Sequence, residues 1–284
     1  MVACCGYGST PLGLFTVIIP CAPMYLSSWE QYHTGVLYLG YFNGPCEGII
    51  IACLIMALSA IYGPQFYHQN AVDVFGWPFT DPSIHMQHLF VGLCLSALFF
   101  VHIPGCFWNV YQARKNKGLG FLETLPQLTP IVLFFAAYYA WLLSPYSQVL
   151  ERNGLMRVGL IMTFVFGRMT TKIILVRSPI NGRSDGQAHL TKQPFPYFTN
   201  LLIPLFGIAF LINVPYIFKT YTPKETFLTG RDPLLTAEQE SLFVWVYLAF
   251  ATVEYFRWAF QVIDRICKYL DINCLTIKKT KKET

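Results

Sequence analysis

The chain alternates between long apolar stretches and short polar ones, a pattern typical of a protein that crosses a membrane several times. A helix needs about 20 mostly apolar residues to cross the hydrocarbon core. Runs of this kind predict seven spanning helices, at about 10–26, 45–63, 86–110, 126–144, 154–175, 196–218 and 240–263. The first run carries Pro11, Pro20 and Pro23, so we expect a kinked helix packed inside a bundle. The predicted fold is an all-α, polytopic integral membrane helical bundle, with residues 1–284 forming a single membrane domain.

The composition supports a membrane protein and argues against a soluble one. Hydrophobic residues make up 54% of the chain and charged residues 12%, against about 25% charged residues in an average soluble domain. The net charge is +5, but the cations lie between apolar segments, so we expect no nucleic-acid partner. The 9 cysteines form no C-x-x-C pair, which argues against a zinc site and against a disulfide framework.

The basic residues between the spans predict the orientation, because cytosolic loops are enriched in Lys and Arg. One set of alternating loops, together with the basic tail 264–284, holds most of these residues. The opposite set holds Arg152, Lys219, Lys224 and Arg231. We therefore predict that the C-terminus is cytosolic, and that the 27–44 loop shares its side.

The chain ends in Lys281-Lys282-Glu283-Thr284. Lysines at the third and fourth positions from a cytosolic C-terminus resemble the dilysine signal that returns membrane proteins to the endoplasmic reticulum. A solvated basic tail close to anionic lipid is the alternative interpretation.

The polar stretch between the first two predicted spans carries the main candidate chemistry. Its candidate residues are Trp29, Glu30, Tyr32, His33, Asn43 and Glu47. At an aqueous mouth, a carboxylate and an imidazole could orient a phosphate-bearing or amine-bearing substrate, or take part in proton transfer. The aromatic side chains could offer their faces to a quaternary ammonium. An interfacial aromatic belt with a few solvated polar groups is the alternative.

Three further groups of residues are candidates for binding or ion pairing. His85 and His88 have the spacing of a metal-binding pair or of an interfacial pair, and the sequence offers no third ligand nearby. Arg168 lies inside an apolar span, where it would bind a lipid phosphate, pair with an acid on another span or extend to the interface. Glu254 and Arg257 have the spacing of an intrahelical ion pair.

Several motifs follow one another in a characteristic order. They are Trp29-Glu30-x-Tyr32-His33-Thr34, Leu37-Tyr38-Leu39, Asn43-Gly44-Pro45-x-Glu47-Gly48, Ile61-Tyr62-Gly63-Pro64 and Gln193-Pro194-Phe195-Pro196. Together they resemble the fungal cholinephosphotransferase and ethanolaminephosphotransferase group of the CDP-alcohol phosphatidyltransferase family, over nearly the whole chain. The resemblance implies transfer of phosphocholine or phosphoethanolamine from a CDP-alcohol to diacylglycerol, with release of CMP. It also implies Mg²⁺ or Mn²⁺, an endoplasmic reticulum or Golgi membrane, and a homodimer.

One departure from the family concerns catalysis. The family's metal-binding motif, D-G-x-x-A-R-(x)8-G-x-x-x-D-x-x-x-D, does not occur in this chain. We therefore expect the chain to be the C-terminal portion of such an enzyme, with no catalytic residue and no metal ligand of its own, and to be inactive alone. A second departure is the polar segment 176–187, which reads as an insert foreign to the family. We interpret both departures as a missed upstream exon and a short retained intron. A genuine cytosolic loop is the alternative for the insert.

Resemblance and location together implicate the following residues in substrate binding: Trp29, Glu30, Tyr32, His33, Asn43, Glu47 and Arg168. Two other functions stay open. One is a non-catalytic membrane protein of the same fold that binds lipid or pairs with a full-length relative. The other is an unrelated seven-span transporter or receptor. These residues do not decide between choline and ethanolamine, since aromatic faces suit a quaternary ammonium and a carboxylate suits a primary one.

Overall fold

The computed structural model describes residues 2–36, 44–76, 83–176, 195–221 and 234–274, and this part of the chain is helical with connecting turns and no sheet. Its longer helices are α1 (Pro11–Ile18), α2 (Cys21–Thr34), α3 (Gly44–Tyr62), α5 (Met86–Ser96), α6 (Ile103–Lys115), α7 (Thr129–Leu142), α8 (Leu155–Leu175), α9 (Leu202–Tyr221) and α10 (Ala237–Leu270). Shorter elements are η1 (Pro64–His68), α4 (Ala71–Phe75), η2 (Ala97–His102) and η3 (Leu122–Leu128). The all-α prediction is confirmed for the described residues.

The first predicted span is kinked as expected, and it is longer than expected. α1 and α2 are separated at Ile19 and Pro20, and α2 then runs on to Thr34. Gly35, with φ of 81°, ends α2 in the left-handed conformation that glycine adopts most readily. The prediction of a loop beginning at residue 27 was therefore wrong. It followed from the polar side chains, but no helix-breaking residue stands between Pro23 and Gly35.

The predicted span 86–110 is one continuous helical rod that extends to Lys115. α5 and α6 are joined by η2, a stretch of π-helix just before Pro104. A proline inside an α-helix lacks the N–H and clashes with the preceding turn, and the wider π-turn relieves that crowding. His102 lies in this stretch, and its Nε2 is 3.1 Å from the carbonyl oxygen of Pro23 in α2. The π-turn η2 thus contacts the first turn of α2, close to the break between α1 and α2.

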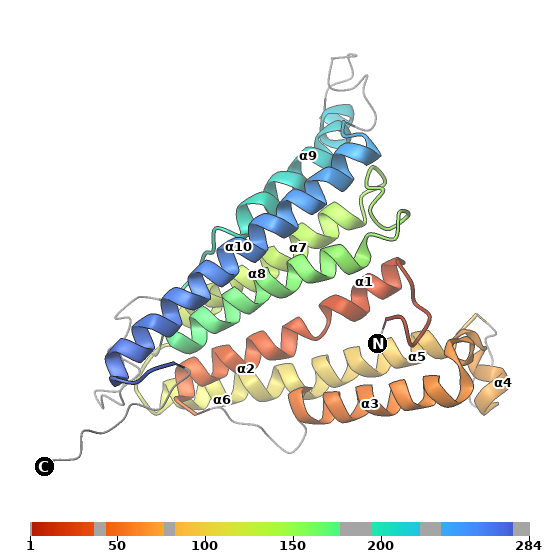
Figure 1. The fold of residues 1–284 in the computed structure, drawn as a ribbon. Coiled ribbons are helices and arrows are strands. Elements are labelled where there is room, and N and C mark those ends of the chain that lie inside the picture. Colours follow the sequence, from red (N-terminus) through yellow and green to blue (C-terminus); the bar gives the residue numbers. More distant parts are fainter. Residues whose placement is uncertain (1, 37–43, 77–82, 177–194, 222–233, 275–284) are drawn as a thin grey trace, which may run out of the picture.

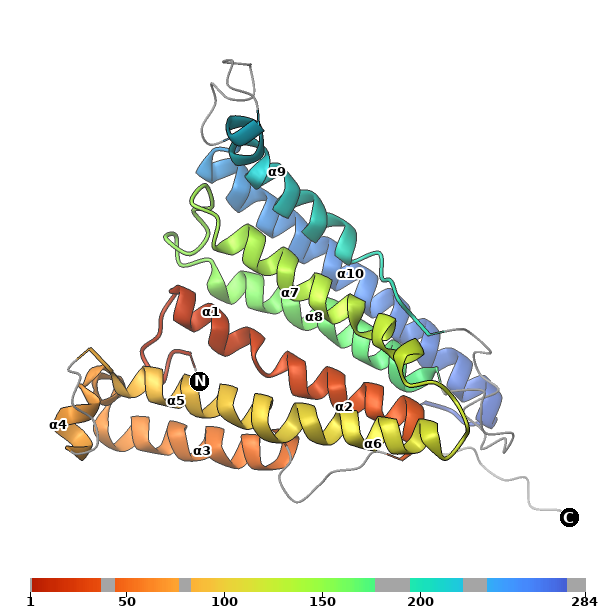
Figure 2. The same ribbon diagram turned by 180° about the vertical axis from the view of Figure 1, so that it is seen from behind.

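The helices lie side by side in two groups that meet at α8 (Figures 1 and 2). α8 packs against α10 on one side and against α2 on the other, while α2 packs against α6 and α7 packs against α9. α2, α6, α8 and α10 all finish at the same end of the bundle, which we call the α2–α6 end. The chain therefore brings the last turns of α2 and α8 close together.

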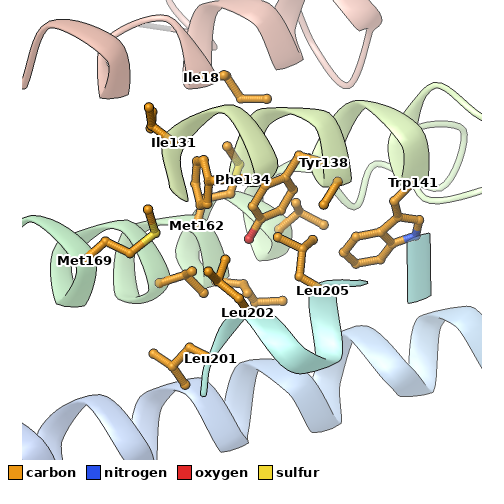
Figure 3. Close-up of a cluster of buried hydrophobic side chains, with 14 of the residues drawn as sticks. Ile18, Ile131, Phe134, Tyr138, Trp141, Met162, Met169, Leu201, Leu202 and Leu205 are labelled. Carbon is orange, nitrogen blue, oxygen red and sulfur yellow. The ribbon is translucent and has the colours of Figure 1, made fainter. Parts of the chain in front are cut away.

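The main apolar core lies between α7, α8 and α9. Phe134, Tyr138 and Trp141 of α7 are fully buried, with Phe134 beside Met162 of α8 and Leu205 of α9 lying between Tyr138 and Trp141 (Figure 3). Lipid tails are as apolar as these side chains, so in a membrane the gain comes mainly from close packing rather than from leaving water. Aromatic rings with adjacent faces and edges suit that requirement.

Four helical stretches of the described residues are long and apolar enough to cross a membrane: Pro11–Thr34, Met86–Lys115, Leu122–Leu142 and Leu155–Leu175. Two shorter apolar helices are Gly48–Tyr62 and Leu202–Ile217. α10 is 34 residues long, but its acidic and basic residues lower its apolar character. The chain is thus a multi-pass membrane protein, and the predicted count of seven spans stays a prediction.

A buried carboxylate joins three elements at the opposite end of the bundle. Glu240, in the first turn of α10, is 3% exposed. It accepts hydrogen bonds from Trp141 Nε1 at 2.9 Å, Ser147 Oγ at 2.8 Å and the Gln148 backbone N–H at 2.8 Å. These bonds hold the end of α7 and the turn before α8 against α10, and hydrogen bonds to a charged acceptor are among the stronger ones.

Replacing Glu240 by alanine would leave three buried donors without an acceptor. We expect Glu240→Ala to lower the free energy of unfolding in detergent by about 3 kcal/mol. The measurement is thermal and chemical unfolding followed by far-ultraviolet circular dichroism. Glu238→Ala is the matched control, since Glu238 lies two residues away on α10 and is exposed. Equal stabilities of the two variants would contradict the anchoring role of Glu240.

Candidate functional site

The polar residues of the last turns of α2 are buried inside the bundle. Trp29 is 0% exposed, and Glu30 and His33 are each 3% exposed. The 3.6-residue period of a helix places positions 29, 30 and 33 on one face. That face meets α6 and η3. For these three residues, the interpretation as solvated groups of an interfacial belt was wrong.

Glu30 is paired with an amide of the neighbouring helix. The Asn109 side chain on α6 donates a hydrogen bond from Nδ2 to Glu30 Oε1 at 2.9 Å. A buried carboxylate is expensive to desolvate unless it is hydrogen-bonded or meets a cation. The hydrogen bond from Asn109 fixes the carboxyl group of Glu30 within the bundle, close to the α2–α6 end.

His33 and Trp29 share one acceptor, which determines the tautomer of the histidine. Gln127 Oε1 accepts from Trp29 Nε1 at 2.9 Å and lies 2.7 Å from His33 Nε2. An amide oxygen only accepts, so Nε2 of His33 carries the proton and Nδ1 carries a free lone pair. Within the described residues, Nδ1 is buried and has no hydrogen-bond partner. The site thus contains a buried imidazole nitrogen able to accept a hydrogen bond.

A basic residue covers the end of α2. Lys117, just beyond α6, donates from Nζ to the backbone oxygen of His33 at 2.7 Å. This carbonyl belongs to the last turn of α2, where a cation is favoured by the helix dipole. Burial, and to a lesser extent the charge of Arg114, lower the pKa of Lys117 below its usual value. The cluster of Glu30 and His33 is therefore bordered by positive charge.

A small cavity of about 50 Å³ lies on another face of α2, between α2 and the end of α8, and neither Glu30 nor His33 lines it. It is lined by Ser28, Gln31, Tyr32, Gly35, Ile173, Ile174 and Val176. The Tyr32 ring lies edge-on to His33 at 5.1 Å and to Phe195 at 5.2 Å between ring centroids. Ligand pockets usually enclose about 300–1,000 Å³, so this cavity is too small to hold a drug-sized ligand.

The other predicted site residues either lie apart from this cluster or fall outside the residues that the structure describes. Asn43 is outside the described residues. Glu47 lies in the first turn of α3, and its side chain is outside them as well. Arg168 is on α8, where its contacts are with Glu254 and Trp258 of α10. The interpretation that Arg168 pairs with an acid on another span is confirmed, as is the Glu254–Arg257 pair at 3.0 Å.

Three residues that contact the predicted site residues were not predicted from the sequence: Asn109, Lys117 and Gln127. Asn109 and Gln127 lie near the ends of apolar segments, where a lone amide signals a hydrogen bond across helices. Their partners, however, come from a different helix and depend on how the bundle packs. Lys117 offered no signal beyond its positive charge.

The histidine pair at the start of α5 acts as a helix cap. The backbone N–H of His85 donates to His88 Nδ1 at 3.3 Å, and the two rings stack with centroids 5.6 Å apart. Among the described residues, no three His, Cys, Asp or Glu side chains gather closely enough to hold a metal ion. This part of the chain therefore does not fit the Mg²⁺ or Mn²⁺ site that the resemblance implies for the family.

The chain is similar to known cholinephosphotransferases and choline/ethanolaminephosphotransferases over most of its length. It is 29% identical to cholinephosphotransferase 1 of Saccharomyces cerevisiae over 98% of this chain and 65% of that protein. It is 25% identical to choline/ethanolaminephosphotransferase 1 of the same yeast, over 90% of this chain and 60% of that protein. A CDP-alcohol phosphatidyltransferase class-I family protein of Schizosaccharomyces pombe is 28% identical over 68% of this chain and 50% of that protein.

This chain is a homologue of the CDP-alcohol phosphatidyltransferase class-I family. A CDP-alcohol phosphatidyltransferase homologue is not an unrelated transporter or receptor, so that alternative does not hold. The chain spans between 50% and 65% of the length of the three relatives named. No family model matches the sequence, and no solved structure matches the chain.

Gln127 offers a direct test of the site's geometry. We expect Gln127→Leu to lower the free energy of unfolding in detergent by about 2 kcal/mol, because Trp29 Nε1 and His33 Nε2 both lose their acceptor. Thermal unfolding measures the change. Gln69→Leu is the control, since Gln69 is exposed and lies between η1 and α4, away from Trp29 and His33 in the sequence. A stability equal to that of the control would contradict the shared hydrogen bond.

Proposed function

We propose that this chain handles substrate in the transfer of phosphocholine or phosphoethanolamine from a CDP-alcohol to diacylglycerol. The observation that carries the proposal is the buried cluster of Glu30 and His33, in a homologue of proteins with that chemistry. In such a transfer, the diacylglycerol hydroxyl loses its proton, and its oxygen bonds to the phosphorus of the phosphoalcohol. The bond from that phosphorus to CMP breaks, and CMP leaves with the electron pair.

We propose that Glu30 attracts the positively charged head group of the alcohol. A carboxylate held by Asn109 is fixed in position, so it neutralises an ammonium with little loss of side-chain freedom. His33 Nδ1 then offers a hydrogen-bond acceptor beside it. Trp29, Tyr32, Asn43 and Glu47 complete the proposed contacts to the head group. None of them is proposed as a catalytic residue.

Choline and ethanolamine are both compatible with this site. Aromatic rings around the cluster suit a quaternary ammonium, whereas a carboxylate also suits a primary one. We propose that diacylglycerol and the CDP-alcohol are the partners of the transfer, in a membrane bundle of about seven spans with α3, α9 and α10 crossing as well.

A second candidate function follows from the sequence rather than from the fold. The chain contains no D-G-x-x-A-R-(x)8-G-x-x-x-D-x-x-x-D motif, whose aspartates bind the divalent metal in the family. We propose that the chain by itself binds substrate or lipid without catalysing transfer. A homodimer, or pairing with a full-length relative, would then bring it to an active centre.

The experiment expresses the chain alone in membranes from cells that lack endogenous phosphotransferases. We expect saturable binding of CDP-choline with no CMP release in the presence of Mg²⁺. We also expect Glu30→Gln to weaken that binding by about tenfold, because the ammonium loses its opposing charge. Glu238→Gln is the control for a lost exposed carboxylate.

Two outcomes would contradict different parts of the proposal. CMP release that depends on CDP-choline and Mg²⁺ would contradict the proposed inactivity of the chain alone. Identical affinities of Glu30→Gln and the wild-type chain would contradict the head-group role of Glu30.

We further propose that the chain resides in the endoplasmic reticulum membrane, or in the Golgi, with its tail in the cytosol. The tail residues 275–284 lie outside the described residues, so this proposal rests on the sequence alone. We expect the Lys281→Ser/Lys282→Ser variant to leave the endoplasmic reticulum for later compartments, measured by fluorescence microscopy of a tagged chain. Lys278→Ser/Lys279→Ser is the control of equal charge loss. The same distribution for both variants would contradict a dilysine signal.

A further inference from the structure

Arg168 is a buried cation in the second half of α8, at the contact with α10. Arg168 is 7% exposed. Its Nη1 lies 3.6 Å from Glu254 Oε2, and its guanidinium carbon lies 5.7 Å from the centre of the Trp258 ring. A distance of 3.6 Å allows an ion pair but exceeds the range of a good hydrogen bond. Glu254 therefore offsets the charge of Arg168 without satisfying its donors.

The donors of Arg168 are the unusual feature of this contact. Within the described residues, Nε and Nη1 are both buried and have no hydrogen-bond partner. A guanidinium presents five N–H groups in a planar fork that matches the oxygens of a phosphate or a carboxylate. Leaving such donors unpaired in a buried place is costly. The unpaired N–H groups of Arg168 therefore have the arrangement that binds two oxygens of an anion.

The charges around Arg168 do not balance. Lys172 lies one turn further along α8, and Arg257 of α10 pairs with Glu254 at 3.0 Å. Glu254 is thus shared by Arg168 and Arg257. Among these four side chains, three are cationic and one is anionic. A cluster with this excess of positive charge at the edge of a membrane bundle attracts an anion.

The start of α9 adds a further attraction for negative charge. Lys172 Nζ donates to the backbone oxygen of Phe198 at 3.3 Å, which places the segment before α9 beside the cluster. The next residue, Thr199, is 1% exposed, and its hydroxyl has no hydrogen-bond partner within the described residues. α9 begins three residues later, and the N-terminus of a 20-residue helix carries partial positive charge.

We propose that Arg168, Lys172 and the segment at Thr199 bind a phosphate group. The unfilled fork of Arg168 would take two of its oxygens, and Lys172 would supply the second charge. The group could belong to an anionic phospholipid that enters from the membrane, or to a soluble phosphate. The contacts of this site are with α10 and the start of α9, whereas the Glu30–His33 cluster contacts α6 and η3. The phosphate site does not depend on transfer activity.

The experiment measures lipid binding to the purified full chain in detergent by native mass spectrometry. The probes are dioleoyl phosphatidic acid and dioleoylglycerol, which has the same acyl chains and no phosphate. We expect Arg168→Gln and Lys172→Gln each to weaken phosphatidic acid binding by at least about tenfold, with dioleoylglycerol binding unchanged. Lys268→Gln is the control, since Lys268 is an exposed cation on α10 paired with Asp264 at 2.7 Å.

Competition with inorganic phosphate separates the two sources. Displacement of phosphatidic acid by millimolar phosphate would assign the site to a soluble anion, and no displacement would assign it to a lipid.

Arg168 is buried, so Arg168→Gln is used only if circular dichroism shows it folded. Lys172 is half-buried, and Lys172→Gln decides the matter alone if the other variant does not fold. Unchanged phosphatidic acid binding in Lys172→Gln would overturn the proposal.

Discussion

The bundle depends on the requirement that polar groups buried in a membrane find their partners within the chain. Hydrocarbon offers no hydrogen bonds, so each polar side chain in the interior has to meet another helix or a connecting segment. Glu240, Glu30 and Gln127 each do so, and each joins elements far apart in the sequence. Close packing of apolar side chains brings the helices together, but these polar contacts select which faces meet.

Because of this requirement, a buried polar atom that lacks a hydrogen-bond partner is a candidate for binding a ligand. His33 Nδ1 and the donors of Arg168 are among the few buried side-chain polar atoms that have no hydrogen-bond partner within the described residues. Both lie toward the α2–α6 end, which the distribution of basic residues predicts to be cytosolic. Glu30 contacts Asn109 of α6, whereas Arg168 contacts Glu254 of α10, so the two buried ionisable groups lie at different helix contacts.

Much of the fold was predictable from the sequence, and the reasons are local. The apolar runs at 45–63 and 154–175 became α3 and α8 almost residue for residue, because spanning length and composition suffice to define such helices. The end of α2 was missed, since polar residues such as Glu30 look like a loop until their partners are known. α9 begins at Leu202 rather than 196, and Lys172 and Tyr247 bind carbonyl groups of the non-helical segment before it.

Of the candidate site, the individual residues could be named but not their arrangement. Trp29, Glu30 and His33 were conspicuous as polar and aromatic groups next to an apolar run. Asn109 and Gln127, however, come from other helices, and nothing in the sequence pairs them with α2. The π-turn of η2 adds to this difficulty. A π-turn holds one residue more than an α-helical turn, so a 3.6-residue pattern continued from α5 into α6 is shifted by one position, or about 100°. Extended from α5, that pattern would assign Asn109 to the wrong face of the rod, whereas the π-turn absorbs the extra residue and Asn109 meets Glu30.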